Sequence, residues 1–233
     1  MRNLLIVIFT LTFIITAKSQ NNRISTHQTI GWYNYFGTLK LKNKFSLHTE
    51  YQWRRENIIT NWQQSLTRIG LNYQLKPNIL LRAGYAYVKT YAYGDIPLNA
   101  LGKNFTEHRF YQMAQLGHKE GIVNFTHRFM LEQRFVGRYN NASSITEDEY
   151  PLLHRLRYMA RLQLPLKNKE IKNNTPYFAM YNEIFVGFGK NVNANVFDQN
   201  RLGILLGYNL NKTYRVEGGY LSQIVQFGRQ INN

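Results

Sequence analysis

Single-residue alternation of apolar and polar side chains runs through several segments of this chain and constrains its fold more than any other feature. In residues 45–54, Phe, Leu, Thr, Tyr and Trp alternate with Ser, His, Glu, Gln and Arg. Residues 123–135, 155–164, 201–210 and 214–220 repeat the pattern. Because successive side chains of a β-strand point to opposite faces, each segment predicts a strand with one apolar and one polar face.

Weaker copies of the alternation bring the predicted strands to ten, and they occupy residues 28–36, 62–75, 78–92, 105–118 and 176–188. The longest predicted connectors are 93–104, 136–150 and 189–198, and they alternate with short turns such as 37–43, 75–78, 119–121 and 211–212. Long loops on one rim and short turns on the other are typical of outer-membrane barrels. The expected fold is all-β: a closed antiparallel transmembrane β-barrel of about 10–12 strands.

The upper strand count comes from the end of the sequence. The chain ends on Asn233, whereas barrels inserted by the usual assembly machinery tend to finish on a strand with a terminal aromatic residue. Either a last strand is missing from this sequence or the assembly signal is atypical. A missing hairpin would raise the count to about twelve strands, an even number that suits a closed barrel.

The orientation of the two faces separates a membrane barrel from a soluble lipocalin-like carrier, because the alternation alone does not show which face is inside. The polar faces carry Arg and Glu in mid-strand with few lysines, and the apolar faces are rich in Leu, Phe and Tyr. A narrow polar lumen favours Arg paired with Glu, whereas a solvated exterior mixes in Lys and Asp freely. Aromatic clusters at 32–36 and 85–93 are typical of rings at headgroup depth. These features favour the membrane barrel and leave the soluble carrier as an alternative.

The N-terminus predicts export. An apolar block from Leu4 to Thr16 follows Arg2, and Ala17 and Ser19 place small residues at −3 and −1 before Gln20. We interpret residues 1–19 as a cleavable signal peptide and 20–233 as a single outer-membrane barrel domain; a membrane anchor helix is the alternative, but the block falls short of the roughly 20 residues that span a bilayer. The expected location is the outer membrane of a Gram-negative bacterium. The sequence contains no cysteine, which excludes a lipoprotein anchor, a disulfide framework and a thiolate metal site.

A strongly basic balance indicates anionic neighbours. The formal charge of +16 falls to +14 once Arg2 and Lys18 leave with the signal peptide. An exported chain with no basic run and no helix-turn-helix pattern makes nucleic acid a poor candidate. The expected partners are outer-membrane lipids, including lipopolysaccharide phosphates, the barrel assembly machinery during insertion, and an unknown partner protein if one exists.

Charged residues on the predicted inner faces of several strands form the densest polar cluster. This lumen charge network comprises Glu107, Arg109, Arg128, Glu132, Arg134, Arg155, Arg157, Arg161, Glu183, Arg201, Arg215 and Glu217. Residues i and i+2 share a face, so Glu107 is expected beside Arg109, and Glu132 beside Arg134. The cluster predicts either a packed plug or, because arginine exceeds glutamate, an anion-selective lumen or binding site.

Catalysis has weaker support. The histidines that could act as a base are His108, His118, His127 and His154, and the candidate serines are Ser65, Ser143, Ser144 and Ser222. No GxSxG elbow is present, and no HxH or HExxH spacing suggests a metal. The acidic segment 147–149 could hold calcium but lacks the glycine and spacing of a known loop, so a solvated loop is expected. We predict no catalytic residue, metal or cofactor, and keep an outer-leaflet acyl hydrolase or acyltransferase as the alternative.

Short motifs in a fixed order carry a family resemblance. They are Trp53-Arg54-Arg55, Gly84-Tyr85, Glu107-His108-Arg109, Leu131-Glu132-Gln133-Arg134, Arg155-Leu156-Arg157 and Asn182-Glu183-Ile184-Phe185. Over roughly residues 28–225 the chain resembles the uncharacterised barrels of domain-of-unknown-function family 2490, found chiefly in Bacteroidota. The resemblance implies an outer-membrane barrel and leaves the activity open. Apart from His108, Gln133 and Ile184, the polar motif residues are expected to face inward.

The expected function follows from the predicted barrel and its charges. The chain is expected to bind or pass a small or anionic solute through an interior lined with Arg and Glu, or to serve a purely structural role.

Overall fold

The fold is dominated by one antiparallel sheet of ten strands. The computed structural model describes residues 24–192, 195–227 and 231–232, so the predicted signal peptide, residues 1–19, lies outside the described residues. The ten strands are β2 (Ile30–Lys40), β3 (Phe45–Glu56), β4 (Asn61–Lys76), β5 (Ile79–Thr90), β6 (Phe105–Glu120), β7 (Val123–Val136), β8 (Leu152–Pro165), β9 (Thr175–Phe188), β10 (Phe197–Asn209) and β11 (Arg215–Val225). The ten predicted strands are confirmed.

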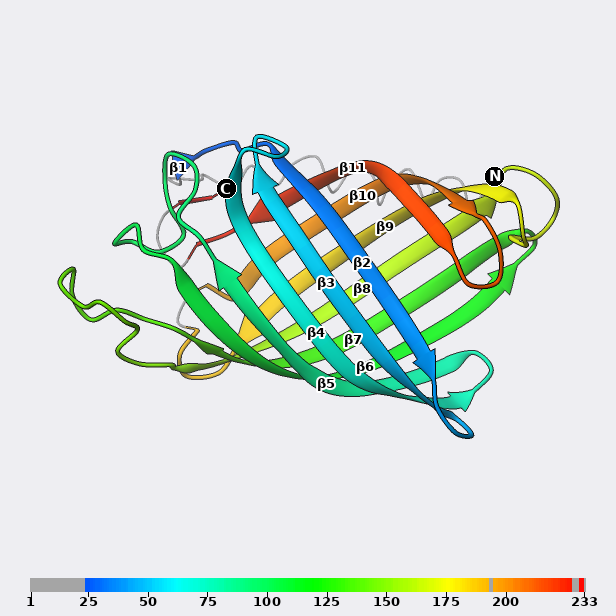
Figure 1. The fold of residues 1–233 in the computed structure, drawn as a ribbon, viewed down its shortest axis with the longest axis horizontal. Helices are drawn as coiled ribbons and strands as arrows, with labels where there is room; N and C mark the ends of the chain where they lie inside the picture. The colour runs from blue at the N-terminus through cyan, green and yellow to red at the C-terminus, as the bar shows by residue number, and fades with distance from the viewer. Residues whose placement is uncertain (1–23, 193–194, 228–230, 233) are drawn as a thin grey trace, which may run out of the picture.

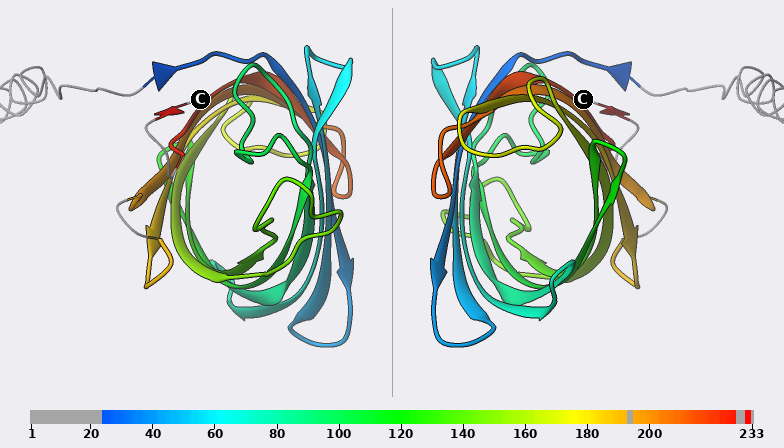
Figure 2. Two further views of the ribbon diagram at one scale, coloured as in Figure 1. Left: turned by 90° about the vertical axis from the view of Figure 1, so that its left-hand side faces the viewer. Right: turned by 90° about the vertical axis from the view of Figure 1, so that its right-hand side faces the viewer.

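The strands follow one another as a meander, and each pairs with its neighbour in sequence from β2 to β11. The sheet curls around a long axis into a half-barrel, with β2 and β11 as its two edges (Figures 1 and 2). Two short strands, β1 (Ile24–Ser25) and β12 (Ile231–Asn232), form a separate parallel pair. Within the described ranges, no helix is long and apolar enough to cross a membrane.

The register places charged residues opposite one another on the inner face of the sheet. Glu50 lies opposite Arg68, Glu132 opposite Arg155, and Glu183 opposite Arg201. All six of these side chains are buried. The curvature of the sheet turns their face inward, so the hydrogen-bonded strands bring the charges of the sequence into a common interior.

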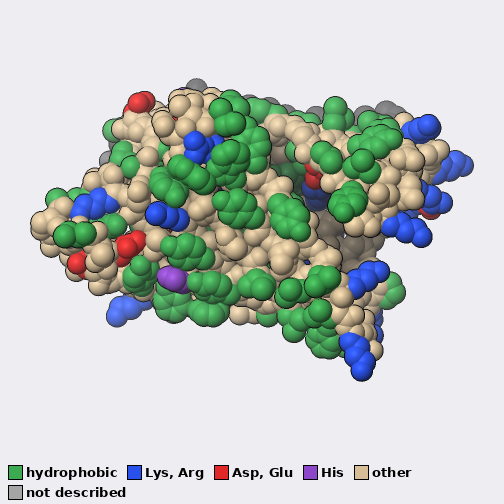
Figure 3. All heavy atoms as spheres, in the orientation of Figure 1, with side chains coloured by type: hydrophobic (Ala, Val, Ile, Leu, Met, Phe, Trp, Pro, Cys, Tyr) green, Lys and Arg blue, Asp and Glu red, His purple; other side chains and the backbone are tan. Residues whose placement is uncertain are grey.

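The outer face is apolar and exposed. Leu71, Leu156 and Leu206 point outward, and Leu206 is 63% exposed, whereas Glu132 on the inner face is 1% exposed. Hydrophobic side chains cover much of the surface in Figure 3. This distribution is the reverse of a soluble barrel, whose apolar side chains fill the interior. A soluble lipocalin-like carrier would have its apolar face inside, whereas the structure has its polar face inside.

The two ends of the half-barrel differ. The strands are joined at one end, here called the loop rim, by residues 57–60, 91–104, 137–151 and 189–196. The opposite end, the turn rim, contains residues 41–44, 77–78, 121–122, 166–174 and 210–214. The three longest predicted loops all lie at the loop rim, at the left of Figure 1. The short connector 57–60 shares that rim with them, so not every connector there is long.

Three details of the sequence-based prediction are wrong. Residues 37–40 were expected in a turn, but β2 continues to Lys40, and the chain reverses at 41–44, where Asn43 has φ of 58°. The turn expected at 119–121 lies at 121–122, because Gly121 takes the left-handed φ of 57°. Arg55 and Asn182 were expected to face inward. They lie on the outer face, Arg55 beside the Trp53 and Trp62 rings and Asn182 hydrogen-bonded to Asn200.

Candidate functional site

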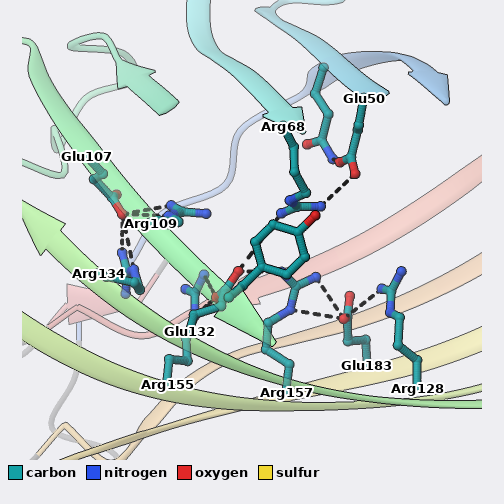
Figure 4. A network of polar contacts seen from close by, with 12 residues as sticks. Glu50, Arg68, Glu107, Arg109, Arg128, Glu132, Arg134, Arg155, Arg157 and Glu183 are labelled. Atoms are coloured by element: carbon teal, nitrogen blue, oxygen red, sulfur yellow. Dashed lines mark hydrogen bonds and ion pairs between the residues drawn. The ribbon is translucent and has the colours of Figure 1, made fainter. Parts of the chain in front are cut away.

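The most buried charge of the interior is Glu132 on β7. It accepts charge-assisted hydrogen bonds from Arg155 at 2.6 Å and from Arg157 at 2.8 Å, both on the neighbouring strand β8 (Figure 4). Arg68 approaches the same carboxylate to 3.9 Å from β4. Because β4 and β7 are not neighbours in the sheet, this last contact spans the interior.

Glu183 on β9 is a second bridging carboxylate. Arg157 donates to it at 2.8 Å and Arg128 at 2.9 Å, while Arg201 lies 3.9 Å away. Arg157 therefore contacts both Glu183 and Glu132. A carboxylate that accepts from two guanidinium groups retains its charge in a buried position, because each side compensates the desolvation of the other.

Glu50 on β3 completes this arrangement. Arg68 donates to Glu50 at 2.6 Å, and the His48 ring lies 3.3 Å from the same carboxylate. We call seven of the connected residues the central network: Glu50, Arg68, Arg128, Glu132, Arg155, Arg157 and Glu183. Asp198 and Arg201 contact this network from the cavity side, through Arg155 and Glu183. Beside the network, Tyr111, Met113 and Met130 form a buried apolar cluster, against which Leu80 packs. Charge pairs and apolar side chains together fill the middle of the half-barrel.

A separate ion cluster surrounds Glu107. Arg109 on the same strand donates to Glu107 at 2.8 Å, and Arg134 on β7 donates at 2.9 Å. The expected contact of Glu107 with Arg109 is present. Glu132 and Arg134 share the inner face of β7, as expected. Arg134 nevertheless pairs with Glu107, because the β6–β7 register places Arg134 opposite Arg109.

The remaining members of the predicted network lie nearer the turn rim. Arg161 pairs with Glu217, which also accepts a hydrogen bond from the Tyr177 hydroxyl at 2.6 Å. The Arg215 guanidinium lies 5.5 Å from the centre of the Tyr177 ring. Among the described residues, no ion pair or hydrogen bond joins them to the central network, so the structure divides the predicted set into three groups and not one continuous ladder.

A cavity of about 380 Å³ lies between the central network and the loop rim. Eight arginines line it: Arg54, Arg68, Arg109, Arg134, Arg138, Arg155, Arg157 and Arg201. Among the residues that the structure describes, the only carboxylates that line it are those of Glu107 and Asp198. The central network lies directly beneath the cavity and adds three carboxylates, Glu50, Glu132 and Glu183, and one further arginine, Arg128. The cavity and the network together then contain nine arginines and five carboxylates. The cavity wall therefore carries an excess of positive charge.

Arg54 and Arg201 contribute to this excess from buried positions. Arg54 is 6% exposed, and no carboxylate of the described residues lies within 4 Å of it. Its guanidinium lies 3.8 Å from the centre of the Trp32 ring, and that of Arg201 lies 4.8 Å from the same ring. The Nε atoms of both arginines lack a hydrogen-bond partner in the described part of the chain. Buried donors without an acceptor are the feature that an anionic ligand would satisfy.

Sequence reasoning did not include Arg54, Arg68, Glu50 and Asp198 in the predicted network. Glu50 and Arg54 were assigned to the polar face of their strand, which was a usable signal. Arg68 lies in a segment with weak alternation, and Asp198 was assigned to a loop, whereas it lies in β10 and pairs with Arg155 at 2.6 Å. Partners from strands that are not adjacent in the sheet depend on its curvature, which the alternation does not specify.

The histidines considered for catalysis have other contacts. His108 lies 2.6 Å from the Tyr85 hydroxyl and His127 lies 2.9 Å from the Tyr158 hydroxyl, both on the outer face. The His118 ring stacks on His127 with ring centres 5.5 Å apart. Across residues 24–192, 195–227 and 231–232, no hydrogen bond joins a serine to a histidine, and no group of three or more His, Asp or Glu is arranged to hold a metal ion.

The acidic segment 147–149 serves to hold its own loop. Glu147 accepts hydrogen bonds from the backbone N–H and the hydroxyl of Thr106 at 2.9 and 3.0 Å. The backbone N–H of Asn140 donates to Asp148 at 2.8 Å and holds the pKa of that carboxyl below its usual value. These contacts order the longest connector of the loop rim beside the cavity mouth.

Comparison with known proteins identifies a family and no function. A search of curated proteins and a search of solved structures give no significant match to this chain. A family model described as "Protein of unknown function (DUF2490)" matches residues 29–232, which include all ten strands of the main sheet. The chain therefore belongs to the DUF2490 family of proteins of unknown function.

Proposed function

We propose that this protein is an outer-membrane β-barrel that binds a small anion in the arginine-lined cavity at its loop rim. In this proposal the central network is a plug, so the protein binds its ligand and does not conduct it through the barrel. The observation that carries the proposal is the cationic excess of the cavity, which contains eight lining arginines and two lining carboxylates.

The distribution of side chains supports a membrane location. The outer face exposes rows of Leu, Ile, Phe and Tyr, while Arg and Glu occupy the interior. An apolar surface of this extent is costly in water and favourable in hydrocarbon. Inside a bilayer, the backbone groups of the edge strands need partners, because no water is present to satisfy them.

We infer that closure occurs between β2 and β11, the two edges of the sheet. The two edges come close near the loop rim in Figure 1. On the inner face, Trp32 of β2 is contacted by Arg201 of β10, the strand next to β11. A contact between residues of the first and ninth strands of the sheet supports a barrel whose seam is nearly closed at this end.

Burial of the central network supports binding over passage. Glu50, Glu132 and Glu183 are each less than 5% exposed, and their carboxylates bond guanidinium groups from other strands. Tyr111 and Met130, which pack beside the network, are also buried. An ion could pass only after several buried ion pairs had separated, which is costly in a low-dielectric interior.

Guanidinium chemistry indicates the class of ligand. Planar forks of N–H donors match phosphate and carboxylate oxygens, and such pairs are often bidentate. The cavity volume of about 380 Å³ falls in the range of small-molecule sites. Apolar side chains such as Leu66, Val136 and Leu153 also line the wall, so the ligand combines an anionic group with a compact body.

The experiment is a calorimetric titration of the detergent-folded protein with inorganic pyrophosphate. Wild-type protein is expected to bind, and Arg54→Gln is expected to lose about tenfold or more in affinity, because a charge-assisted hydrogen bond contributes about 1.5–3 kcal/mol. Arg215→Gln is the matched control, since Arg215 also lacks a carboxylate partner within 4 Å in the described chain but does not line the cavity. Equal affinity of wild type and Arg54→Gln would contradict the proposal.

The membrane location has its own test. Vesicles formed with the mature protein are floated in a density gradient after an alkaline wash, which removes peripheral proteins. The proposal expects the protein to remain with the vesicles. Release of the folded protein into the wash would contradict a membrane-spanning barrel.

A further inference from the structure

Lysines are concentrated at the turn rim. Residues 39–46, 75–80, 119–124, 164–176 and 208–216 contain all the turns of this end with the strand ends beside them. The lysines among them are Lys40, Lys42, Lys44, Lys76, Lys119, Lys167, Lys169, Lys172 and Lys212, and all nine are exposed. Lys and Arg side chains are prominent at this end, at the right of Figure 3.

Few carboxylates neutralise these lysines. The same ranges contain only Glu120 and Glu170. Glu170 pairs with Lys119 at 3.2 Å and with Lys172 at 3.0 Å. The other seven lysines have no carboxylate within 4 Å among the residues that the structure describes. The turn rim therefore presents a ring of amines with most of its charge uncompensated.

The loop rim gives an internal comparison. Its connectors, with two flanking residues on each side, contain five cationic residues: Arg55, Lys89, Lys103, Arg138 and Lys190. They contain six carboxylates: Glu56, Asp95, Glu147, Asp148, Glu149 and Asp198. The formal charge of the loop rim is thus near zero. Of the charge carried by the connectors at the two rims, the positive excess is therefore concentrated at the turn rim.

An apolar and aromatic belt lies directly inside the lysine ring. Leu39 and Leu41 flank Lys40, and Leu75 precedes Lys76; these leucines are exposed. Lys44 lies over the Tyr73 ring, with its Nζ 5.9 Å from the ring centre. Near the other edge of the sheet, Tyr208 at the end of β10 and Leu210 directly after it are exposed, and Lys212 follows them. On β4 and β10 an outward-facing row of leucines with one tyrosine precedes the lysine at the turn, so apolar and aromatic side chains give way to amines, as hydrocarbon gives way to headgroups in a bilayer.

We propose that the turn rim binds the phosphate headgroups of anionic phospholipids in the leaflet that surrounds it. The inference rests on the proposed membrane barrel, which places the apolar belt in hydrocarbon and the amines at headgroup depth. Lysine suits this role, because a flexible stem lets the amine reach a mobile phosphate while its methylene groups stay in the apolar layer. The turn rim would then fix the depth and orientation of the barrel by charge as well as by its apolar belt.

The test uses the detergent-folded full chain with equimolar phosphatidylglycerol and phosphatidylcholine. Native mass spectrometry counts the lipids of each kind that remain bound. Wild type is expected to retain phosphatidylglycerol preferentially, with less preference in high salt, because exposed charges are screened. The variant Lys42→Gln, Lys167→Gln, Lys169→Gln and Lys212→Gln is expected to lose that preference, with up to about fivefold for each lysine removed.

A pair of double variants isolates the position of the charge. Lys167→Gln with Lys169→Gln alters the turn rim, and Lys89→Gln with Lys190→Gln removes the same charge from the loop rim. Only the first pair is expected to weaken phosphatidylglycerol retention. Equal loss in both pairs, or no preference in wild type, would overturn the lipid site. Neither result would contradict the proposed membrane barrel. That proposal would instead be contradicted by release of the folded protein from vesicles in the alkaline wash.

Discussion

The central network and the loop-rim cavity are built from the same kinds of residue, yet they differ in how their charges are balanced. In the central network, Glu132 and Glu183 each accept from two arginines within 3 Å. In the cavity, Arg54 has no carboxylate within 4 Å in the described chain and Arg201 has one only at 3.9 Å. The two regions are adjacent, because Arg155 and Arg157 belong to the network and also line the cavity.

The difference separates a structural role from a binding role. Breaking a buried ion pair by removing one partner leaves an uncompensated charge and destabilises the fold strongly. Removing a buried cation that has no anionic partner relieves a desolvation cost instead. Substitutions in the two regions should therefore differ in their effect on stability even though each removes one charge.

The largest expected effect is on stability, from Glu132→Gln. This substitution removes the carboxylate shared by Arg155 and Arg157, and we expect the free energy of unfolding to fall by about 3 kcal/mol. The measurement is a urea titration of the protein folded in lipid vesicles. Glu170→Gln at the turn rim is the control and should change stability by less than about 1 kcal/mol, because its pairs with Lys119 and Lys172 are exposed. Equal stability of Glu132→Gln and Glu170→Gln would contradict a structural role of the central network.

The second effect is on binding, from Arg54→Gln. Its stability should stay within about 1 kcal/mol of wild type, because the lost stacking on Trp32 is offset by the removal of an unpaired buried charge. Its pyrophosphate affinity should fall about tenfold or more. If Arg54→Gln lost stability but kept its affinity for pyrophosphate, Arg54 would have a structural role and not a binding role. Parallel unfolding and calorimetric titrations decide this.

The smallest effect is expected from Arg161→Gln. Arg161 pairs with Glu217 in a partly exposed position near the turn rim and does not line the cavity. We expect a stability loss of less than about 1 kcal/mol and unchanged anion affinity. A large loss of affinity in this variant would show that charge at a distance, and not contact in the cavity, governs binding.

Much of the fold could be predicted from the sequence, because the alternation reports directly which side chains share a face. Glu132 and Arg157 were assigned to the inner face on this basis, and both are buried there. The end of β2 was missed because Gly37 resembles a turn residue, while the backbone reverses at Asn43. Closure of the sheet was expected but depends on its edges, and the alternation within each strand carries no information about how distant edges meet.

Less of the candidate site could be predicted. The spacing along one strand predicts the contact of Glu107 with Arg109, but the same spacing does not pair Glu132 with Arg134, whose partner is Glu107. The contact of Arg68 with Glu132 joins strands that are not neighbours, so it requires the curvature of the whole sheet. The sequence also did not predict that Arg54 has no carboxylate nearby, because this is known only once the partners of the neighbouring carboxylates are known.

The most direct test of the anion cavity uses the absence of cysteine from the sequence, which permits single-cysteine labelling. Gln223→Cys places a thiol in the cavity wall, and Ser143→Cys places one on the exposed surface of the loop rim. Each variant is reacted with an anionic and with a cationic methanethiosulfonate reagent, and the ratio of the two rates is compared. We expect an anionic-to-cationic ratio at least about tenfold higher at position 223 than at position 143, because the cavity arginines without a close carboxylate attract anions. Equal ratios at the two positions would contradict a cationic binding cavity.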